Sequence, residues 1–209
     1  MAFAFVTSLT VGFSAHHAMA FRWSGHRCRS ALSAMAADAA NTGHSPAWYE
    51  QGLNFSCTKC GNCCTGPTGF VWFSEAEGHA MAARLGLSHE AFLDKYARRV
   101  RTRGLLKTWR AWALKEVPSD RGLSCVLLDK NGHCSVYTDR PKQCTTYPIW
   151  PEHIESREAW AALAEDCPGA AKGTGDRYLP ERIAAVLAEM DAYWATIEAE
   201  EERRRHGPG

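Results

Sequence analysis

Several features that define common classes of protein are missing from this sequence. No apolar run approaches the roughly 20 residues that a transmembrane helix needs, so no membrane span is predicted. Neither sign of charge is in excess, because 24 basic and 23 acidic residues leave a formal net charge of +1. This balance gives no electrostatic reason to expect nucleic acid or an anionic membrane surface as a partner.

Patterns that mark well-known catalytic sites are missing too. The chain has no phosphate-binding loop, no Ser-His-Asp order and no nucleotide-binding glycine pattern. Asp129 and Glu75 have no second carboxylate at a convincing spacing. The residue in unusual supply is cysteine, with nine in the chain and eight of them between Cys57 and Cys167.

The amino terminus lacks acidic residues, and the first one is Asp38. Residues 1–20 resemble a signal peptide that ends in the cleavage pattern Ala18-Met19-Ala20, and residues 21–40 have the Arg, Ser and Ala content of a transit peptide. Together they resemble the bipartite presequence of algae with complex plastids, which predicts a plastid location, with the mitochondrion as the alternative. Cys28 lies in this segment, so the mature protein would keep eight cysteines.

The remaining length suits one domain with a real core. We expect a cysteine-cluster domain over residues 41–175 and a C-terminal amphipathic helix and tail over 176–209. The expected fold class is α+β: a small single domain with short strands, several helices and a cysteine-rich metal centre.

Local patterns predict the main elements. Residues 70–73 form a strand-like apolar run, Ser74 and Glu77 form a capping box for a helix that ends near Gly86, and Ser88 caps a second helix that continues to Val100. The other face of that helix would carry a basic run, which we interpret as solvated: Lys95, Arg98, Arg99, Arg101 and Arg103.

Further along, the Asn131-Gly132 step predicts a hairpin between strands at 123–128 and 134–137. A short helix is expected over 156–166. A long helix follows Pro180, with an apolar stripe and a tail from Glu198 that frays into solvent. The stripe consists of Ile183, Val186, Leu187, Met190, Tyr193, Trp194 and Ile197.

The cysteines follow the pattern C-x2-C-x2-C-C-x60-C-x8-C-x9-C-x22-C. A C-x2-C turn lets two thiolates converge on one ion, and both tetrahedral zinc and iron–sulfur clusters accept that geometry. Adjacent side chains usually point apart, so Cys63 and Cys64 favour two nearby sites or a polynuclear centre with shared ligands. The eight expected metal ligands are Cys57, Cys60, Cys63, Cys64, Cys125, Cys134, Cys144 and Cys167.

The cysteines have two other interpretations. Eight cysteines could form four disulfides in a secreted chain, but disulfide-dense folds are usually short and C-x2-C-x2-C-C is crowded for separate bridges. A redox-active thiol pair is the third interpretation. Metal is favoured, and the count of sulfurs does not decide between zinc and an iron–sulfur cluster.

The chain resembles the CxxCxxCC cysteine-cluster family, whose domain is regarded as zinc- or iron-chelating. The matching stretches, within about residues 55–170, are CTKCGNCCTGPTGFVWFSEAEG, RLGLSHEAFLDKYARRV, SCVLLDKNGHCSVYTDRPKQCTTYPIWP and AWAALAEDCPG. The resemblance implies that each of the eight cysteines falls on one of the eight that define the family. One branch includes a flagellin lysine N-methylase, but this chain has no recognisable extra domain for binding S-adenosylmethionine.

Several other side chains are candidates for a role at the site. Arg140 could neutralise a thiolate-rich centre and Tyr147 could hydrogen-bond a sulfur or a substrate, although we favour local carbonyl capping for Arg140 and core packing for Tyr147. The tryptophans Trp72, Trp150 and Trp160 could wall a pocket, but burial in the core is favoured. The histidines His79, His133 and His153 are interpreted as surface residues, since the cysteines already supply enough ligands.

These observations predict a metal-binding protein with eight thiolate ligands and a structural or metal-handling role in an organelle. Its cofactor would be zinc or an iron–sulfur cluster. The first alternative is an iron–sulfur-dependent enzyme that modifies a protein side chain, in the manner of a lysine N-methylase. The second is a zinc-stapled protein-interaction module. The sequence identifies no protein partner, substrate or catalytic residue.

Overall fold

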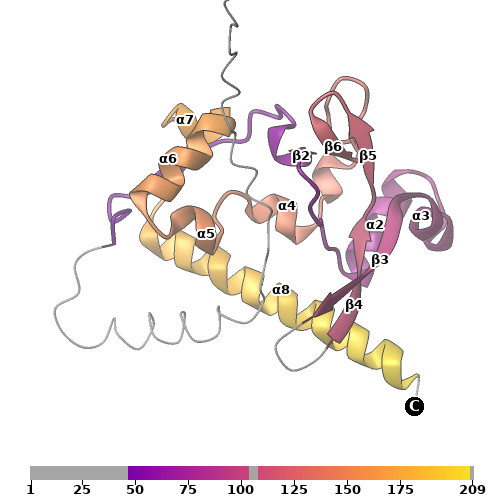
Figure 1. Cartoon of the computed structure of the whole chain (residues 1–209). Coiled ribbons are helices and arrows are strands. Elements are labelled where there is room, and N and C mark those ends of the chain that lie inside the picture. Colours follow the sequence, from indigo (N-terminus) through magenta and orange to yellow (C-terminus); the bar gives the residue numbers. More distant parts are fainter. Residues whose placement is uncertain (1–46, 104–107, 208–209) are drawn as a thin grey trace, which may run out of the picture.

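The computed structural model describes residues 47–103 and 108–207, with side chains described outside 102–109. The fold is α+β, as predicted: it combines short antiparallel strands, arranged in small sheets, with separate helices (Figure 1). The predicted presequence over 1–40 lies outside the described residues, and so does Cys28.

The strands form small antiparallel sheets. β1 (Leu53–Phe55) pairs with β7 (Asp176–Tyr178), and β3 (Ala97–Arg103) pairs with β4 (Thr108–Leu114). A third sheet has the order β2-β6-β5, formed by Thr65–Gly66, Gly122–Cys125 and Glu116–Ser119. The β1–β7 pair joins chain segments on both sides of the cysteine-rich region, so it closes the fold around that region.

Three helices begin directly after a serine that caps them. Ser74 and Glu77 form the predicted capping box at the start of α2 (Glu75–Arg84), and Ser88 caps α3 (His89–Tyr96). Ser156 caps α6 (Arg157–Asp166), close to the predicted bounds. The shorter helices are α4 (Lys142–Thr146), α5 (Pro151–Ile154) and α7 (Pro168–Ala171), with 3-10 turns η1 (Asn62–Cys64) and η2 (Tyr137–Asp139).

The long helix α8 (Pro180–His206) runs beneath both halves of the molecule (Figure 1). Toward its start, Ile183 and Leu187 pack with Leu53, Ile149 and Ile154. Farther along, Met190, Tyr193 and Ile197 pack with Trp72, Ala111 and Ala113. The predicted apolar stripe is therefore buried at these positions, and α8 completes two separate parts of the core.

The prediction of a frayed tail is wrong. α8 continues to His206, and Glu200 and Glu201 are buried. Arg99 donates to both oxygens of the Glu201 carboxylate at 2.7 and 2.6 Å, and Arg204 donates to it at 2.6 Å. The Glu200 carboxylate accepts from the backbone N–H of Glu75 at 2.9 Å. Paired partners from distant segments thus fix a stretch that looks solvent-exposed in sequence.

The prediction that the second helix continues to Val100 is also wrong. α3 ends at Tyr96, and the chain enters β3 at Ala97. The residues Ala97 to Arg103 also fit a period of two, with a β-branched residue at Val100. Val100 packs against the core that β4 shares with α8, so burial on a sheet face decides the outcome.

The predicted strands at 70–73 and 134–137 are reduced to single bridges. Trp72 bridges Ala113, and Cys134 bridges Leu128. The Asp129 carboxylate accepts from the backbone N–H groups of Asn131 and His133, both at 2.8 Å, and closes the turn between Leu128 and Cys134. The residues after Cys134 enter the 3-10 turn η2 in place of a strand.

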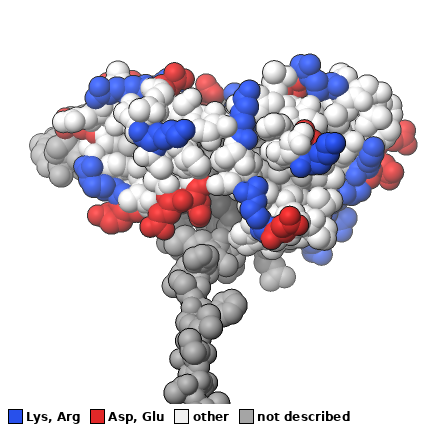
Figure 2. Space-filling view, turned by 90° about the horizontal axis from the view of Figure 1, so that it is seen from above, with Lys and Arg blue, Asp and Glu red and all other residues white. Residues whose placement is uncertain are grey.

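None of the helices in the described residues is long and apolar enough to cross a membrane. On the face shown in Figure 2, basic and acidic side chains are interspersed without a large field of one sign. This distribution agrees with the nearly neutral composition of the chain.

Candidate metal centre

The first four cysteines lie on a short loop that ends in the turn η1. The loop needs left-handed backbone at Lys59, with φ of 58°, and at Gly61, with φ of 76°. Gly61 also packs closely on the turn after β6, because a Cβ atom there would stand 2.9 Å from the carbonyl oxygen of Gly132. The glycine in CTKCGNCC is therefore required both by conformation and by contact.

Asn62 connects this loop to two other segments. Its Nδ2 donates to the carbonyl of Asp166 at 2.8 Å, directly before Cys167, and its Oδ1 accepts from Arg121 at 2.7 Å. Asn62 thus holds the cysteine loop beside the end of α6 and beside the β5–β6 turn. No local pattern in the sequence indicates this role, because the two partners of Asn62 lie 104 and 59 positions away.

The later cysteines come from four different elements. Cys125 ends β6, Cys134 bridges Leu128, Cys144 lies on α4, and Cys167 joins α6 to α7. All eight cysteines in the described residues are free thiols. Those at 57, 60 and 63 are exposed and Cys167 is buried, so the cluster is open on the side of the first loop.

Cys63 is the common neighbour of the cluster. Its sulfur lies 3.7 Å from that of Cys64, and this contact, together with desolvation of the sulfur, raises the pKa of the Cys63 thiol, although the residue as a whole is exposed. Its negative charge as a thiolate would also raise the pKa values of thiols on other elements, at Cys125, Cys134, Cys144 and Cys167. Cysteines separated by more than sixty residues in sequence therefore gather around the turn at 62–64.

The neighbours of Cys63 fall into two groups. Cys125 and Cys134 each raise the pKa of Cys144, so these three thiols lie near one another. On the other side, Cys60 raises the pKa of Cys167, and Tyr147 lies within the influence of both. A thiolate at Cys63 would act on thiols of both groups.

Burial is the main reason that the later thiols resist ionisation. It raises the pKa of Cys125 to about 11 and raises that of Cys144 well above its usual value. In the described residues, no three His, Cys, Asp or Glu side chains are yet close enough together to hold one ion. A soft cation with thiolate preference would displace these protons and draw the sulfurs together, so the donor set fits zinc or iron.

Arg140 supplies the positive charge beside the cluster. Its guanidinium lies 3.7 Å from the centre of the Tyr137 ring, and its positive charge offsets part of the rise in pKa that burial causes at Cys134 and Cys144. Its Nε atom is buried and has no hydrogen-bond partner, and no carbonyl in the described residues accepts from Arg140. The preference for local carbonyl capping is therefore wrong, and the neutralising role fits the structure.

Tyr147 fits both of the roles weighed for it. It packs with Phe55, Cys167 and Ala170, as a core residue would. Burial raises the pKa of its hydroxyl, and so do the neighbouring thiols, among them Cys167, which lies within hydrogen-bond range. Tyr147 is thus a core residue whose hydroxyl lies beside thiols of the cluster.

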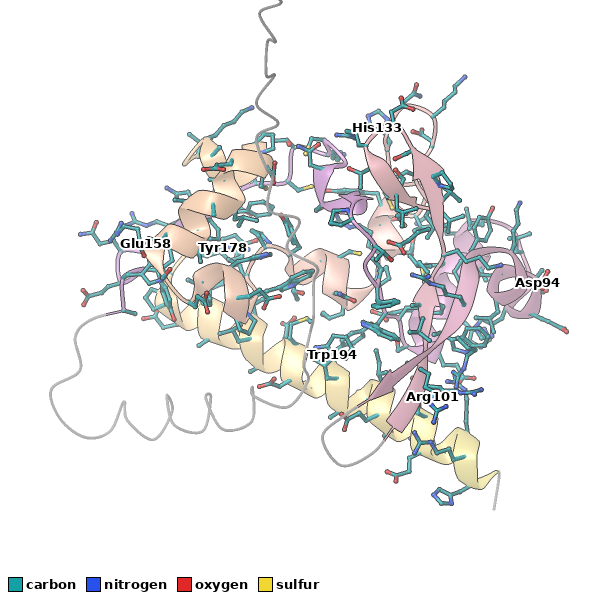
Figure 3. The ribbon with its side chains drawn as sticks, viewed as in Figure 1. Asp94, Arg101, His133, Glu158, Tyr178 and Trp194 are labelled. Atoms are coloured by element: carbon teal, nitrogen blue, oxygen red, sulfur yellow. The ribbon has the colours of Figure 1, made fainter. Side chains whose placement is uncertain are left out.

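The histidines differ from one another in position. His133 is exposed on the turn after β6, as predicted (Figure 3). His79 is exposed and stacks on His89 with 3.7 Å between ring centres. His153 is half-buried, in contrast to the two exposed histidines: burial lowers its pKa and its Nδ1 lies 3.1 Å from the carbonyl of Pro148.

A cavity of about 220 Å³ adjoins the cluster. Its lining includes Cys63, Cys64 and Cys125 together with Trp150 and His153. Trp150 stacks on His153 at 5.4 Å and therefore does wall a pocket. Of the other two candidate tryptophans, Trp72 is buried in the core as predicted. Trp160 is only partly buried against the apolar clusters and lines a second cavity, of about 570 Å³.

Comparison with known proteins identifies one matching family. The model of the CxxCxxCC family, described as a putative zinc- or iron-chelating domain, matches residues 56–168, which is just over half of the chain. The match spans all eight clustered cysteines together with Arg140 and Tyr147. No solved structure matches the chain.

Proposed function

The chain belongs to the CxxCxxCC family of zinc- or iron-chelating domains, and from this premise we propose that its eight clustered thiols are the metal ligands of a metal-handling or structural protein. The observation that carries the proposal is the position of Cys63, whose charge influences thiols on β6, the following turn, α4 and the α6–α7 junction. Because the ligands come from several distant segments, metal binding would link these segments and so stabilise the fold.

The two groups around Cys63 support a division of the ligands. One group would consist of Cys63 with Cys125, Cys134 and Cys144, and Arg140 would lie beside it. The other would draw on the first loop and Cys167: Cys57, Cys60, Cys64 and Cys167. The 3.7 Å between the sulfurs of Cys63 and Cys64 makes these two residues the junction between the groups.

Each part of the chain has a definite task in this proposal. The thiols release protons as they bind the metal, Arg140 offsets the negative charge of the thiolates, and Asn62 keeps the first loop in register with Cys167. When bound, zinc would supply a rigid tetrahedral staple and an iron–sulfur cluster would supply electron transfer.

Anaerobic purification of the full chain tests the proposal. For an iron–sulfur protein, analysis should find iron together with sulfide, and the protein should absorb at roughly 400 nm. For a zinc protein, analysis should find about two zinc ions per chain in a colourless sample. The substitution of Cys28, which lies outside the cluster, by Ser is the control and should leave the metal content unchanged. Freshly isolated protein without metal, and with the eight cysteines paired as disulfides, would refute the proposal.

The cavity beside the thiols favours a second candidate, an iron–sulfur-dependent enzyme that acts on a protein side chain. At about 220 Å³ it has room for one side chain, and its lining combines thiols of the cluster with Trp150 and His153. A colourless zinc protein would rule this candidate out. An iron–sulfur protein whose electron paramagnetic resonance signal changes on adding a lysine-rich peptide would support it.

Location in a plastid is a further part of the proposal. It rests on the acid-free first 37 residues and on the Ala18-Met19-Ala20 pattern followed by Phe21. A fusion of residues 1–40 to a fluorescent protein, expressed in an alga with complex plastids, should accumulate in the plastid. Accumulation in the mitochondrion or in the medium would contradict this location.

A further inference from the structure

The β3–β4 hairpin presents a basic face that the metal centre does not use. The chain carries no acidic residue from Ala97 to Lys115. Arg99 and Arg101 lie on the same face of β3, and their cross-strand partners are Trp112 and Arg110. Arg101 therefore lies directly opposite Arg110 (Figure 3 labels Arg101, beside the C-terminal part of α8).

The register fixes how close these two arginines come. Trp112 accepts at its carbonyl from the N–H of Phe73 and Leu114 donates its N–H to Val71, so both residues direct their backbone groups away from β3. Along a strand of an antiparallel pair, successive residues direct their backbone groups alternately toward the partner strand and away from it. Arg110, two residues before Trp112, therefore also directs its backbone N–H and C=O away from β3. Arg101 and Arg110 thus form a non-hydrogen-bonded pair, the kind with the shorter spacing between side chains.

The neighbouring arginines are neutralised, but this pair is not. Arg98 donates to Glu116 at 2.7 Å and Arg99 donates to Glu201 at 2.6 Å. Arg101 and Arg110 are both exposed, and no ion pair reaches either of them within the described residues. Like charges directly opposite each other destabilise a strand pair, so the isolated protein bears a cost at this position.

The edge of β3 next to Arg101 is open as well. β3 has β4 as its only strand partner within residues 47–103 and 108–207. Since Arg101 belongs to a non-hydrogen-bonded pair, its backbone N–H and C=O point to this open edge. An extended segment added there would meet both free backbone groups and unneutralised guanidinium groups.

We propose that this face binds an acidic extended segment of a partner protein, which pairs along β3 and places carboxylates on Arg101 and Arg110. The planar guanidinium group binds a carboxylate with two parallel hydrogen bonds. Nucleic acid fits less well, because duplex-binding proteins can contact about six to ten phosphates and the described side chains of this face offer one pair of unneutralised arginines. The surface does not depend on the bound metal.

Binding of a labelled peptide to the purified full chain tests the proposal. The probe is a short fluorescent peptide in which Glu alternates with Val, so that its carboxylates share one face of a strand. The double variant Arg101→Gln/Arg110→Gln should bind it about tenfold more weakly, as expected for losing two exposed charge-assisted contacts. The matched control is Lys130→Gln/Lys172→Gln, which removes two exposed cations elsewhere and should bind normally.

Two further measurements separate this binding mode from others. Amide hydrogen exchange at Arg101 should slow when the peptide is bound, because its N–H becomes paired. The double variant alone should unfold at the same temperature as the parent or at a higher one, because a repulsion has been removed. Equal loss of binding in the control variant, unchanged exchange at Arg101, or tighter binding of a single-stranded oligonucleotide than of the peptide would each overturn the proposal.

Discussion

The side chain of Asn62 donates a hydrogen bond to the backbone carbonyl of Asp166, across 104 positions of sequence. This bond joins the loop of the first four cysteines to the residue before Cys167. Residues that hydrogen-bond to metal-binding segments and orient the ligands typically contribute to metal affinity, which falls by about ten- to a hundredfold when they are removed. The contact therefore leads directly to a test.

The substitution Asn62→Ala should weaken metal binding about tenfold, because the loop and Cys167 lose their common anchor. Competition with a chromophoric chelator measures the affinity. Asn131→Ala provides the control, since Asn131 lies on the exposed turn and its backbone, not its side chain, makes the turn contact. Equal affinity in the two variants would show that Asn62 has no such role.

Replacing Arg140 should move metal binding to higher pH. The charge of Arg140 offsets part of the rise in pKa that burial causes at Cys134 and Cys144, so Arg140→Gln raises both pKa values further and makes the protons harder to displace at neutral pH. Arg140→Lys should restore most of the lost affinity. The midpoint of metal binding against pH is the readout, and Arg84→Gln, which removes an exposed neighbour of Asp139, is the control. A midpoint unchanged in Arg140→Gln would exclude the role.

Cys134 and Cys60 report on the two ligand groups separately. Cys134→Ser should reduce metal content and make the turn after β6 sensitive to protease, because the metal closes this segment onto the fold. Cys60→Ser should have the same effect on the first loop. Metal analysis of soluble protein, with limited proteolysis, gives the result. Full metal content in both variants would remove these two cysteines from the ligand set.

The end of α8 should depend on the ion pair between Glu201 and Arg99. Glu201→Gln removes the buried carboxylate that pairs with the partly exposed Arg99 and should reduce the free energy of unfolding by about 2 kcal/mol. Glu198→Gln, on an exposed position of the same helix, should change it little. Chemical denaturation of the metal-loaded protein compares the two variants.

This ion pair also predicts how stability changes with pH. Burial would raise the pKa of Glu201, but the bonds from Arg99 and Arg204 outweigh it and lower the pKa below its usual value. The stabilisation is therefore complete above about pH 4.5 and is lost as the pH falls through the lowered value. Burial raises the pKa of neighbouring Glu200, which acts in the opposite sense. The difference between wild type and Glu201→Gln isolates Glu201 and should shrink in acid; a constant difference would refute this assignment.

Local signals in the sequence were sufficient for the parts of the fold that depend on them. The capping box at Ser74 and Glu77 and the apolar stripe of α8 needed only neighbouring residues. Val100 could not be assigned in this way, because the chain from Ser88 fits both a period of 3.6 and a period of two. Its burial against α8, a long-range contact, favours the strand.

The candidate site also divides into features that local sequence signals predict and features that depend on long-range contacts. The spacing of the cysteines was enough to group them, but which segments meet at Cys63 depends on how α4, α6 and β6 pack. Asn62 and Glu201 resembled ordinary polar residues in sequence, since nothing near them indicates a partner more than a hundred residues away. His153 likewise revealed its burial only in the folded chain.

Every cysteine of the cluster precedes α8 in the chain, and α8 completes two parts of the core. During synthesis the ribosome releases all eight thiols before the helix that finishes their scaffold has emerged. For that interval the nascent chain carries a full set of reactive sulfurs on an unfinished fold. Under the proposed function, those sulfurs would have to stay reduced through this interval if the completed fold is to bind its metal.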